Sequence, residues 1–546
     1  MSSSTALYLA VLLVFILKFQ LRSRLLSWWD SAQFALALEH FNVVQHRPHP
    51  PGYPLYILWG KLFDYITHDP NFSFVLLGLI LSTLAAILIV RFVSSWLNNP
   101  TAGYIAGCLY AFAPLTIYHE LKALTYVASA FFSVLVAWEA YRILFKNEGN
   151  GLRLAFFLGL MGWIRPFESI LLLPLAIWAV SRQGTGRLII GSMIYILMQV
   201  AWIVPVASMS GGIGPYWTEL IAEGGKHQRA IQSVISDPLH KLIVCWQAIY
   251  YYLRQSFPFW AFFMIVPLIA LITGMKKNWK KTAFIILWIG PAIVLYSINY
   301  VNYAGILLFL SPAIALLIAS GLNHLTGFLE KSRIKLLSYR FDQSEINKLL
   351  AVIIALHLLV VFFSVDIQLL GENHRKYDPE GFNYHKMLAS DGYVYMFVDS
   401  VIGLSDRLGG YDSVLIMSDL NYRVLMYYLP NHKILWTRYL SQKQSGVDGV
   451  TKLGKDRLDQ DIQLKPVEYK NAKYWIYELN GNEKTAVFTD EMLVNIVNDE
   501  RVSLLPGTST AKVYMLDLEG KWGIFFRYGK FGTISQKMAR EMGLTK

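Results

Sequence analysis

Residues 72–94 read FSFVLLGLILSTLAAILIVRFVS, and Arg91 is the one charged side chain in this run. An α-helix rises about 1.5 Å per residue, so about 20 apolar residues are needed to cross about 30 Å of hydrocarbon. The run is long enough for that, and it predicts a helix that spans a membrane.

About eleven segments meet the same criterion. Their approximate bounds are 6–20, 72–94, 101–118, 123–145, 152–164, 167–181, 187–209, 256–273, 282–298, 303–321 and 348–366. The break at Trp163-Ile164-Arg165-Pro166 fits either a tight turn at the membrane face or a kink inside one long segment. The expected fold class is therefore a multi-pass α-helical membrane protein.

The composition of the whole chain agrees with this class. Of 546 residues, 55% are hydrophobic and 16% are charged, and the mean hydropathy is +0.39. These values lie outside those of soluble domains, and they exclude disordered, collagen-like and coiled-coil proteins. The two cysteines, Cys108 and Cys245, both lie in apolar runs, so a disulfide framework and a cysteine-based metal site are excluded.

Charge separates the chain into two parts. Residues 1–370 carry 26 Lys and Arg against 15 Asp and Glu, whereas residues 371–546 carry 23 against 22. We therefore expect a membrane domain at 1–366 and a water-soluble domain at 367–546. The formal net charge of +12 lies almost entirely in the first part, where basic loops serve topology and anionic head groups better than nucleic acid.

The positions of Lys and Arg in short loops predict the orientation in the membrane. A cytoplasmic N-terminus places most basic loop residues inside: Arg91, Lys146, Arg153, Arg182, Arg187, Lys276, Lys277, Lys280, Lys281, Lys331, Arg333, Lys335 and Arg340. It leaves Lys18, Arg22, Arg24 and Arg47 outside, so either the orientation is wrong or these charges have another role. With an odd number of spans, the tail lies outside, with loops 21–71 and 210–255 and a turn at 118–122.

Two features of the chain ends bear on localisation. The first apolar run lacks a basic leader and a small-residue cleavage site, so we expect a spanning helix rather than a removed signal. The last residues, 542–546, carry no endoplasmic-reticulum retrieval signal, which favours a prokaryotic cell membrane.

The tail of about 175 residues is long enough for one compact domain. Residues 393–398 and 413–417 have a strand-like pattern, and residues 422–428 have a helix-like one. A mixed α/β domain is expected. It has no glycine-rich nucleotide fingerprint and no P-loop, so no nucleotide is assigned to it.

The first outer loop contains the most informative polar residues. It begins Trp28-Trp29-Asp30-Ser31-Ala32-Gln33-Phe34, and Phe34, Leu38 and Phe41 recur at helical spacing. This pattern predicts an amphipathic helix at the membrane interface with Asp30 or Ser31 near its N-terminus. From composition alone, the better interpretation of Asp30 is a helix cap beside a tryptophan that anchors the helix at the membrane.

A proline-rich segment follows, His46-Arg47-Pro48-His49-Pro50-Pro51-Gly52-Tyr53-Pro54. Proline prevents a continuous helix, so we expect a stiff, extended piece that either connects two helices or presents His46, Arg47 and His49. An acid and several bases at a lipid–water boundary suit the transfer of a group from a lipid-linked phosphate to a hydroxyl. The acid takes a proton from the acceptor, and the cations stabilise the departing phosphate.

These residues resemble a known family. Trp29-Asp30-Ser31 followed by His49-Pro50-Pro51-Gly52-Tyr53-Pro54-Leu55-Tyr56, after a first spanning helix, is similar to the GT-C superfamily of polyprenyl-phosphate-sugar-dependent glycosyltransferases. The likeness is to protein O-mannosyltransferases and to the lipid A aminoarabinose transferase within this superfamily. Further matches are Arg165-Pro166, the segment Tyr303 to Leu308 with Pro312 after it, and the soluble tail.

The resemblance implies an activity and its partners. It implies an inverting transferase that takes a sugar from a dolichyl- or undecaprenyl-type monophosphate and moves it to a hydroxyl acceptor on the outer face. Asp30 matches the family's first-loop acid, the expected general base or acceptor-orienting group. Ser31 stands where O-mannosyltransferases have a second acid, which puts a protein acceptor in doubt.

Other site residues are weaker candidates. In the turn before the fourth span, Glu120 is a candidate second acid, although the likeness aligns Leu124 with that acid, and a helix-end pair of Glu120 with Lys122 is as plausible. Arg165 is either a membrane anchor or a phosphate ligand, and the likeness favours the ligand. The candidate donor- or substrate-binding residues are His46, Arg47, His49, Tyr53, Lys122, Arg165, Lys226 and Arg229.

Two further points stay open at this stage. The acids and histidines could hold a divalent ion such as Mg²⁺ or Mn²⁺, but no spacing demands one. A transporter or flippase of lipid-linked saccharides, or a ligase that uses a polyprenyl diphosphate, also fits a many-helix chain. Against transport, charged residues near the bilayer midplane are scarce, and no duplicated halves appear.

Overall fold

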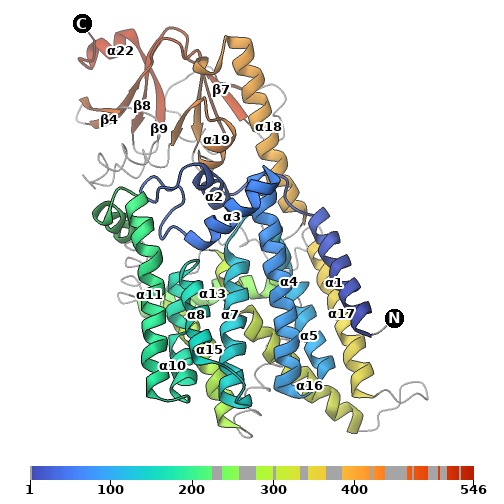
Figure 1. Cartoon of the computed structure of the whole chain (residues 1–546). Helices are drawn as coiled ribbons and strands as arrows, with labels where there is room; N and C mark the ends of the chain where they lie inside the picture. The colour runs from blue at the N-terminus through green and yellow to red at the C-terminus, as the bar shows by residue number, and fades with distance from the viewer. Residues whose placement is uncertain are drawn as a thin grey trace. The chain divides into compact units, whose positions relative to one another are not determined.

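The fold is taken from a computed structural model that describes residues 3–223, 237–256, 278–298, 303–331, 342–363, 384–418, 422–436, 464–469, 472–489, 502–504, 513–527 and 530–545 (Figure 1). The chain divides into two compact units. Met1–Arg24 and Pro50–Leu388 form the first, which we call the membrane unit. Leu25–His49 and Ala389–Lys546 form the second, which we call the tail unit.

The membrane unit is helical, and within its described residues five helices are long and apolar enough to cross a membrane. They are α4 (Pro70–Leu97), α7 with the π-helical turn η1 (Tyr126–Lys146), α11 (Thr185–Met209), α15 (Trp279–Ile298) and α17 (Gln343–Phe363). The other helices of this unit include α1 (Ser3–Gln20), α8 (Gly151–Gly162), α10 (Leu173–Ser181), α13 (Pro238–Ser256), η2 (Ala304–Phe309) and α16 (Ser311–Lys331). The predicted span at 256–273 lies almost wholly outside the described residues, and the count of eleven stays a prediction.

Proline and short polar side chains mark where several helices begin. The helices that start with proline include α3 (Pro54–Thr67), α4, α5 (Pro100–Ala111), α6 (Pro114–Glu120) and α9 (Pro166–Leu171). Proline suits the first helical position because its missing N–H has no partner there anyway. Asp69 accepts a hydrogen bond from the Phe72 N–H at the start of α4, and Asn99 accepts from Thr101 and Ala102 at the start of α5.

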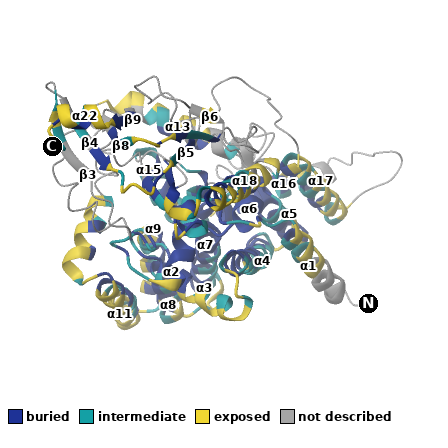
Figure 2. Cartoon of the chain, turned by 90° about the horizontal axis from the view of Figure 1, so that it is seen from above, coloured by how far each residue is buried: buried dark blue, intermediate teal, exposed yellow. Residues whose placement is uncertain are grey.

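The outer surface of α11 is apolar and exposed. Ile189, Met193, Leu197 and Val204 are about half exposed or more, and Figure 2 shows exposed positions along this helix. Such a surface is unfavourable in water but suits hydrocarbon, because the helix satisfies its own backbone hydrogen bonds. α11 is therefore a lipid-facing helix.

The break after α8 is a turn. Gln183, after α10, accepts a hydrogen bond from the Gly151 N–H at the start of α8 (2.8 Å) and donates to the Gly149 carbonyl (2.9 Å). Because the end of α10 meets the start of α8, the chain reverses at residues 163–165. Of the two alternatives for this break, the structure has the tight turn.

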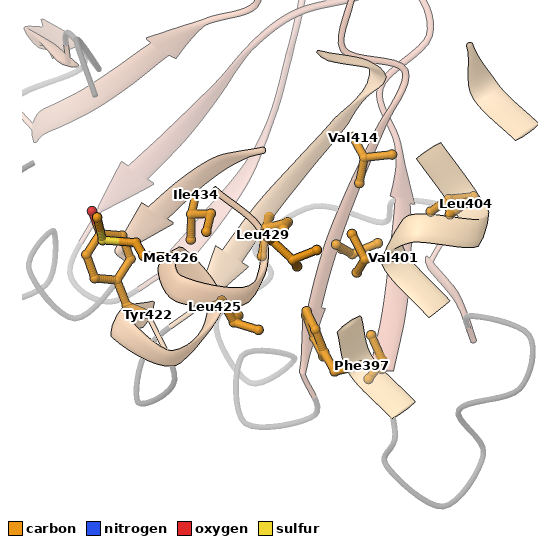
Figure 3. Close-up of a cluster of buried hydrophobic side chains, with 12 residues drawn as sticks. Phe397, Val401, Leu404, Val414, Tyr422, Leu425, Met426, Leu429 and Ile434 are labelled. Atoms are coloured by element: carbon orange, nitrogen blue, oxygen red, sulfur yellow. The ribbon is translucent and has the colours of Figure 1, made fainter. Parts of the chain in front are cut away.

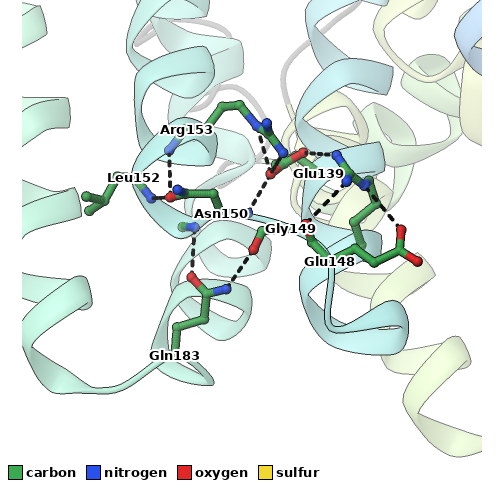
Figure 4. Close-up of polar contacts among 9 residues, drawn as sticks. Glu139, Glu148, Gly149, Asn150, Leu152, Arg153 and Gln183 are labelled. Atoms are coloured by element: carbon green, nitrogen blue, oxygen red, sulfur yellow. Dashed lines mark hydrogen bonds and ion pairs between the residues drawn. The ribbon is translucent and has the colours of Figure 1, made fainter.

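A polar network joins the end of α7 to the start of α8 (Figure 4). The buried Glu139 carboxylate accepts hydrogen bonds from Arg153 (2.7 and 3.0 Å), from the Asn150 N–H (2.6 Å) and from Arg142 (3.4 Å). One acid thus holds two cations and a helix start, which fixes the connection between the two helices.

Glu139→Gln is expected to lower the free energy of unfolding by about 1–2 kcal/mol, because the amide keeps the size but loses the charge that strengthens these bonds. Denaturant unfolding of the purified protein in detergent measures this change. Glu148→Gln is the matched control, since Glu148 is 63% exposed and its carboxylate is as far as 3.8 Å from Arg142, which makes a weak ion pair. Equal effects of the two variants would contradict a structural role for the network.

The tail unit is a mixed α/β structure, as its sequence pattern predicts. Its first sheet has the order β2-β1-β5-β7-β6, with β1 (Val414–Ser418) parallel to β2 (Lys433–Trp436) and β5 (Thr485–Thr489), and with β7 (Val513–Asp517) antiparallel to β5 and β6 (Val502–Leu504). Its second sheet is antiparallel and contains β3 (Leu464–Tyr469), β4 (Ala472–Glu478), β8 (Lys521–Arg527) and β9 (Lys530–Ser535). The helices α19 (Tyr422–Tyr428) and α22 (Gln536–Glu541) complete the named elements around these strands.

One strand prediction in the tail is wrong. Residues 393–398 belong to α18 (Tyr384–Leu408), whereas the predicted strand at 413–417 and helix at 422–428 are confirmed as β1 and α19. The buried hydrophobic residues of α18 are Met387, Val394, Phe397, Val401 and Leu404, at spacings of three, four and seven residues. This helical period over the longer segment outweighs the local content of aromatic and β-branched residues. Phe397, Val401 and Leu404 pack in one hydrophobic cluster with Val414, Leu425 and Ile434 (Figure 3).

Candidate functional site

The first-loop acid lies at the N-terminus of α2 (Trp29–Glu39), which belongs to the tail unit. Asp30 is in the first turn but does not cap the helix. Ser31 does so instead: its hydroxyl accepts from the Trp28 N–H (3.1 Å) and donates to the Trp28 carbonyl (2.8 Å). The Asp30 side chain is 34% exposed, and the helix dipole favours its negative charge at this position. Asp30 is therefore free of a capping duty and partly open to solvent.

The helix α2 is not the amphipathic interfacial helix that its sequence predicts. All residues from Ser31 to Leu38 are buried, so every face of the helix has a protein neighbour. Alanine at positions 32, 35 and 37 lets these neighbours approach closely, and the sequence period does not reveal such contacts. The prediction of an interfacial helix is corrected accordingly.

His49 lies next to Asp30 through a glutamine. The His49 Nδ1 donates to the Gln33 Oε1 at 2.5 Å, and the Asp30 Oδ1 is 3.8 Å from the same nitrogen. Two oxygen acceptors face Nδ1, so the neutral ring carries its proton there and Nε2 is the acceptor. The ring also packs near Phe34, at 5.9 Å between centroids. Asp30, Gln33 and His49 thus form one polar group at the start of α2, which we call the first-loop group.

His46 and Arg47 lie in a turn that starts before the proline-rich segment, whereas the prolines predict an extended piece here. Asn42 and Arg47 exchange two backbone hydrogen bonds, of 2.7 and 2.8 Å. His46 has a left-handed backbone (φ 56°) and is buried. The chain therefore folds back within six residues before it reaches His49.

A second polar group lies in the membrane unit around Arg165. The Arg165 guanidinium donates to the Glu168 Oε1 (2.7 Å) and to the Thr125 hydroxyl (3.1 Å), and it lies 4.6 Å from the Tyr126 ring centroid. The Ser129 hydroxyl donates to the other oxygen of Glu168. Burial, the largest single effect, lowers the pKa of Arg165, but the Glu168 carboxylate and the neighbouring phenol groups together outweigh it, and the pKa is raised. A permanent cation is thus held in a mostly buried position.

Phenol groups lie near this cation, and a further tyrosine and a histidine pack against the Tyr126 ring. Tyr53 and Tyr296 are close enough for their phenol groups to interact with the Arg165 charge. The Tyr296 hydroxyl is buried and finds no hydrogen-bond partner among the described residues. Tyr303 contacts Tyr126 at 5.0 Å between ring centroids, and its hydroxyl lies 3.1 Å from the His119 Nε2.

Gly305 allows these rings to pack. A Cβ atom at this position would lie 2.6 Å from the Tyr126 ring and 2.8 Å from the His119 Nε2. Neither group can retreat without losing its own contacts, so a side chain does not fit. The segment after Tyr303 that carries the family likeness therefore approaches His119 and Tyr126 closely.

Glu120 pairs with Lys18 rather than with Lys122. The Glu120 Oε1 is 2.6 Å from the Lys18 Nζ, and the carboxylate is 1% exposed. The Lys122 Nζ instead donates to the Tyr118 hydroxyl (3.0 Å) and lies over the Tyr118 ring. Both side chains are thus buried in the protein, and neither is in the head-group region as a pair.

The remaining sequence candidates differ in what the structure says of them. Lys226 and Arg229 lie outside the described residues. Among the residues that are described, no group of three or more His, Cys, Asp or Glu is gathered as a metal site. We therefore name no ligand set for Mg²⁺ or Mn²⁺, and a divalent ion stays a prediction.

Sequence reasoning missed several residues of these groups. Glu168 had a detectable signal, because an acid inside an apolar segment is costly unless it has a partner or a function. His119 is next to Glu120 in the turn at 118–122. Gln33 and Tyr296 had no signal, since an amide and a phenol in apolar surroundings are common.

Three comparisons place the chain among known proteins. The family model described as dolichyl-phosphate-mannose-protein mannosyltransferase matches residues 48–209. Protein O-mannosyl-transferase tmem260 of Dictyostelium discoideum is 24% identical over 130 residues, which cover 22% of this chain. The matched part is 15% of the length of that relative.

Solved structures match over nearly the whole chain. ArnT from Cupriavidus metallidurans, in the apo state and bound to undecaprenyl phosphate, aligns with a TM-score of 0.53. The identities are 12% and 11%, and the alignments cover 94% of this chain and 98% of ArnT. The two chains share a fold. The region that matches the family model contains His49, Tyr53, Glu120, Lys122 and Arg165, whereas Asp30 precedes it.

Proposed function

We propose that this chain, which belongs to the GT-C superfamily of integral-membrane glycosyltransferases, transfers a sugar from a polyprenyl monophosphate to a hydroxyl acceptor at the outer face of the membrane. The carrying observation is the buried, permanently charged Arg165 among phenol groups, within the region that matches the mannosyltransferase model. A fixed cation in a medium of low dielectric constant suits the phosphate that such a reaction releases.

The reaction is a single displacement. Asp30 takes the proton of the acceptor hydroxyl while the hydroxyl oxygen attacks the anomeric carbon from the face opposite the phosphate. The bond between the anomeric carbon and the phosphate oxygen breaks with both electrons going to that oxygen, and the sugar is inverted. The product lipid is a polyprenyl monophosphate.

Arg165 and its neighbours stabilise the phosphate. The guanidinium uses two of its nitrogens on Glu168 and Thr125. Glu168 and Thr125 keep the group in place, so it does not have to reorganise when charge develops on the phosphate. The buried Tyr296 hydroxyl is a further donor for a phosphate oxygen. We assign Tyr53, Lys122, His46, Arg47, Lys226 and Arg229 to donor binding as well. ArnT, which shares the fold, is bound to undecaprenyl phosphate in one of its structures, which supports a lipid of this class as the partner.

We further propose a cytoplasmic N-terminus and an extracytoplasmic tail. Basic residues on the outer side speak against this orientation, but two of them have structural roles. Lys18 pairs with the buried Glu120. Arg22 donates to the Phe19 carbonyl and lies over the rings of Phe19 and Phe72. Charges with such partners do not have to follow the loop rule.

A donor panel tests the proposed reaction. The purified protein in lipid nanodiscs is incubated with radiolabelled polyprenyl-monophosphate sugars and with diphosphate-linked glycans, and label leaving the lipid fraction is measured. Release from one or more monophosphates supports the proposal. Release from diphosphates alone indicates a ligase, and uptake of substrate into proteoliposomes without a covalent product indicates a transporter.

Gln33 is expected to matter for the rate although it does not touch the acceptor. It keeps the His49 Nδ1–H in a hydrogen bond to its own Oε1, with 2.5 Å between nitrogen and oxygen, and so directs the proton away from the Asp30 carboxylate. In Gln33→Leu the imidazole is left to bond to Asp30, which then accepts the acceptor proton less readily. One hydrogen bond contributes about 1–1.5 kcal/mol, so the transfer rate falls about tenfold.

The control for Gln33 is Gln536→Leu, an exposed glutamine on α22 of the same unit. The rate constant at saturating donor and acceptor is compared in the two variants, together with donor affinity. Unchanged donor affinity with a slower rate only in Gln33→Leu supports the assignment. A rate equal to that of Gln536→Leu removes Gln33 from the first-loop group.

A further inference from the structure

The C-terminal region contacts the first loop on both sides of α2. At the start of the loop, the Leu26 N–H donates to the Tyr428 hydroxyl at 2.7 Å. After α2, the Arg423 Nη2 donates to the Gln45 carbonyl at 2.8 Å. Both of these side chains come from α19, about 400 residues later in the chain. One short helix thus contacts the loop before and after α2.

The middle of the loop also packs on this region. Ala32 of α2 lies in one buried cluster with Val394 and Val424, and Trp29 contacts Tyr422 at 6.2 Å between ring centroids. These contacts explain why Leu25–His49 belongs to the tail unit. Asp30 therefore lies between two residues that pack against the C-terminal region.

Arg423 is an unusual residue to find at this place. It is 2% exposed, and its other contacts include the Met426 sulfur and the Tyr422 ring. Burying a guanidinium is costly unless it is well hydrogen-bonded. Packing alone is served by leucine or methionine, so the charge points to the bond with Gln45 as the reason for an arginine.

The bond to Gln45 acts on the turn that leads to His49. Gln45 is also held from within, because its N–H donates to the Asn42 side chain (3.2 Å) in the turn closed by Asn42 and Arg47. The turn is thus a small rigid piece, and His49 follows it by two residues. A shift of the Gln45 carbonyl moves His49, and with it the first-loop group.

We propose that Arg423 is a positioning residue for sugar transfer: from the C-terminal domain it fixes the turn at residues 42–47 and thereby the geometry of Asp30 and His49. This inference rests on the proposed function of Asp30. It assigns to the C-terminal domain a part in catalysis itself, distinct from binding an acceptor. A displacement of a reacting group by about 1 Å can lower a rate about a hundredfold, so a loosened turn slows transfer without weakening donor binding.

The test uses the full chain in nanodiscs. Arg423→Met removes the guanidinium and keeps an unbranched apolar side chain, and Tyr428→Phe removes only the hydroxyl at the other end. Arg407→Met is the matched control, since Arg407 is exposed on α18 in the same unit. Three quantities are measured: the rate constant of transfer, the affinity for undecaprenyl phosphate, and amide hydrogen exchange of the peptide covering residues 42–49 and of β1.

We expect Arg423→Met to transfer sugar at least tenfold more slowly, with unchanged lipid affinity and faster exchange at 42–49 only. Tyr428→Phe is expected to have a smaller effect of the same kind. The proposal is overturned if Arg423→Met has the same transfer rate constant and the same amide exchange at 42–49 as Arg407→Met. If β1 also loses protection, Arg423→Met is misfolded and Tyr428→Phe decides: normal rate and exchange in it overturn the proposal.

A failure of the proposed function gives a different pattern. In that case the wild type releases no label from any donor, whereas exchange at 42–49 still responds to Arg423→Met. Such a result removes the catalytic role of Arg423 and leaves it as a structural contact.

Discussion

Asp30→Asn lowers the rate constant of sugar transfer by about two to four orders of magnitude, the range that general acid–base catalysis usually contributes. The amide has nearly the size of the carboxylate but cannot take the acceptor proton. Because Asp30 is 34% exposed and Ser31 caps the helix, the substitution costs at most about 1 kcal/mol of stability through the lost interaction with the helix dipole.

The measurement is a single-turnover transfer assay with a donor identified by the panel. Glu39→Gln is the matched control, since Glu39 is an exposed acid on the same helix. We expect its rate to equal that of the wild type, and we expect Asp30→Asn to bind undecaprenyl phosphate normally. Transfer by Asp30→Asn within a factor of ten of the control would assign the base to another residue.

Arg165→Met is expected to have two effects. The first concerns the donor: a charge-assisted hydrogen bond contributes about 1.5–3 kcal/mol, so the dissociation constant for undecaprenyl phosphate rises by about 10- to 150-fold. The second concerns stability. Glu168 is left as a buried acid without its cation, and breaking such a pair costs about 3–5 kcal/mol.

A double variant separates the two effects. Arg165→Met combined with Glu168→Gln removes the unpaired charge, so the stability recovers in large part while donor affinity stays low. Lipid binding in nanodiscs and unfolding in detergent measure the two quantities, and Arg182→Met, an exposed arginine after α10, is the control. If affinity recovers together with stability, Arg165 is a structural residue and the phosphate is bound elsewhere.

In both polar groups, the sequence identifies some residues and not others. Asp30, His49 and Arg165 are recognisable because polar residues next to Trp and Pro at a lipid boundary are rare, and the family likeness singles them out. The side chains that hold His49 and Glu120 in place are not recognisable in this way. Gln33 holds His49 and Lys18 holds Glu120 through contacts that join separate segments of the chain. Local patterns carry no information on such pairs.

Two corrections have the same origin. α2 has the period of an amphipathic helix, yet Ser31 to Leu38 are all buried, and residues of the C-terminal region pack against Ala32. Residues 393–398 look like a strand, yet they are one part of a longer helix whose buried face covers β1 and α19. In both cases tertiary packing outweighs a signal from a short window.

The sequence by itself determined the membrane class, most of the helix bounds and the α/β nature of the tail, because these follow from hydropathy, helix length and the local chemistry of proline and cap residues. It also pointed to Asp30 and Arg165. Only the tertiary structure decided that the first loop folds with residues from the far end of the chain, that Gln33 holds His49, and that Lys18 pairs with Glu120. Each of these depends on which distant side chains come within hydrogen-bonding distance, and that is set by the packing of whole elements.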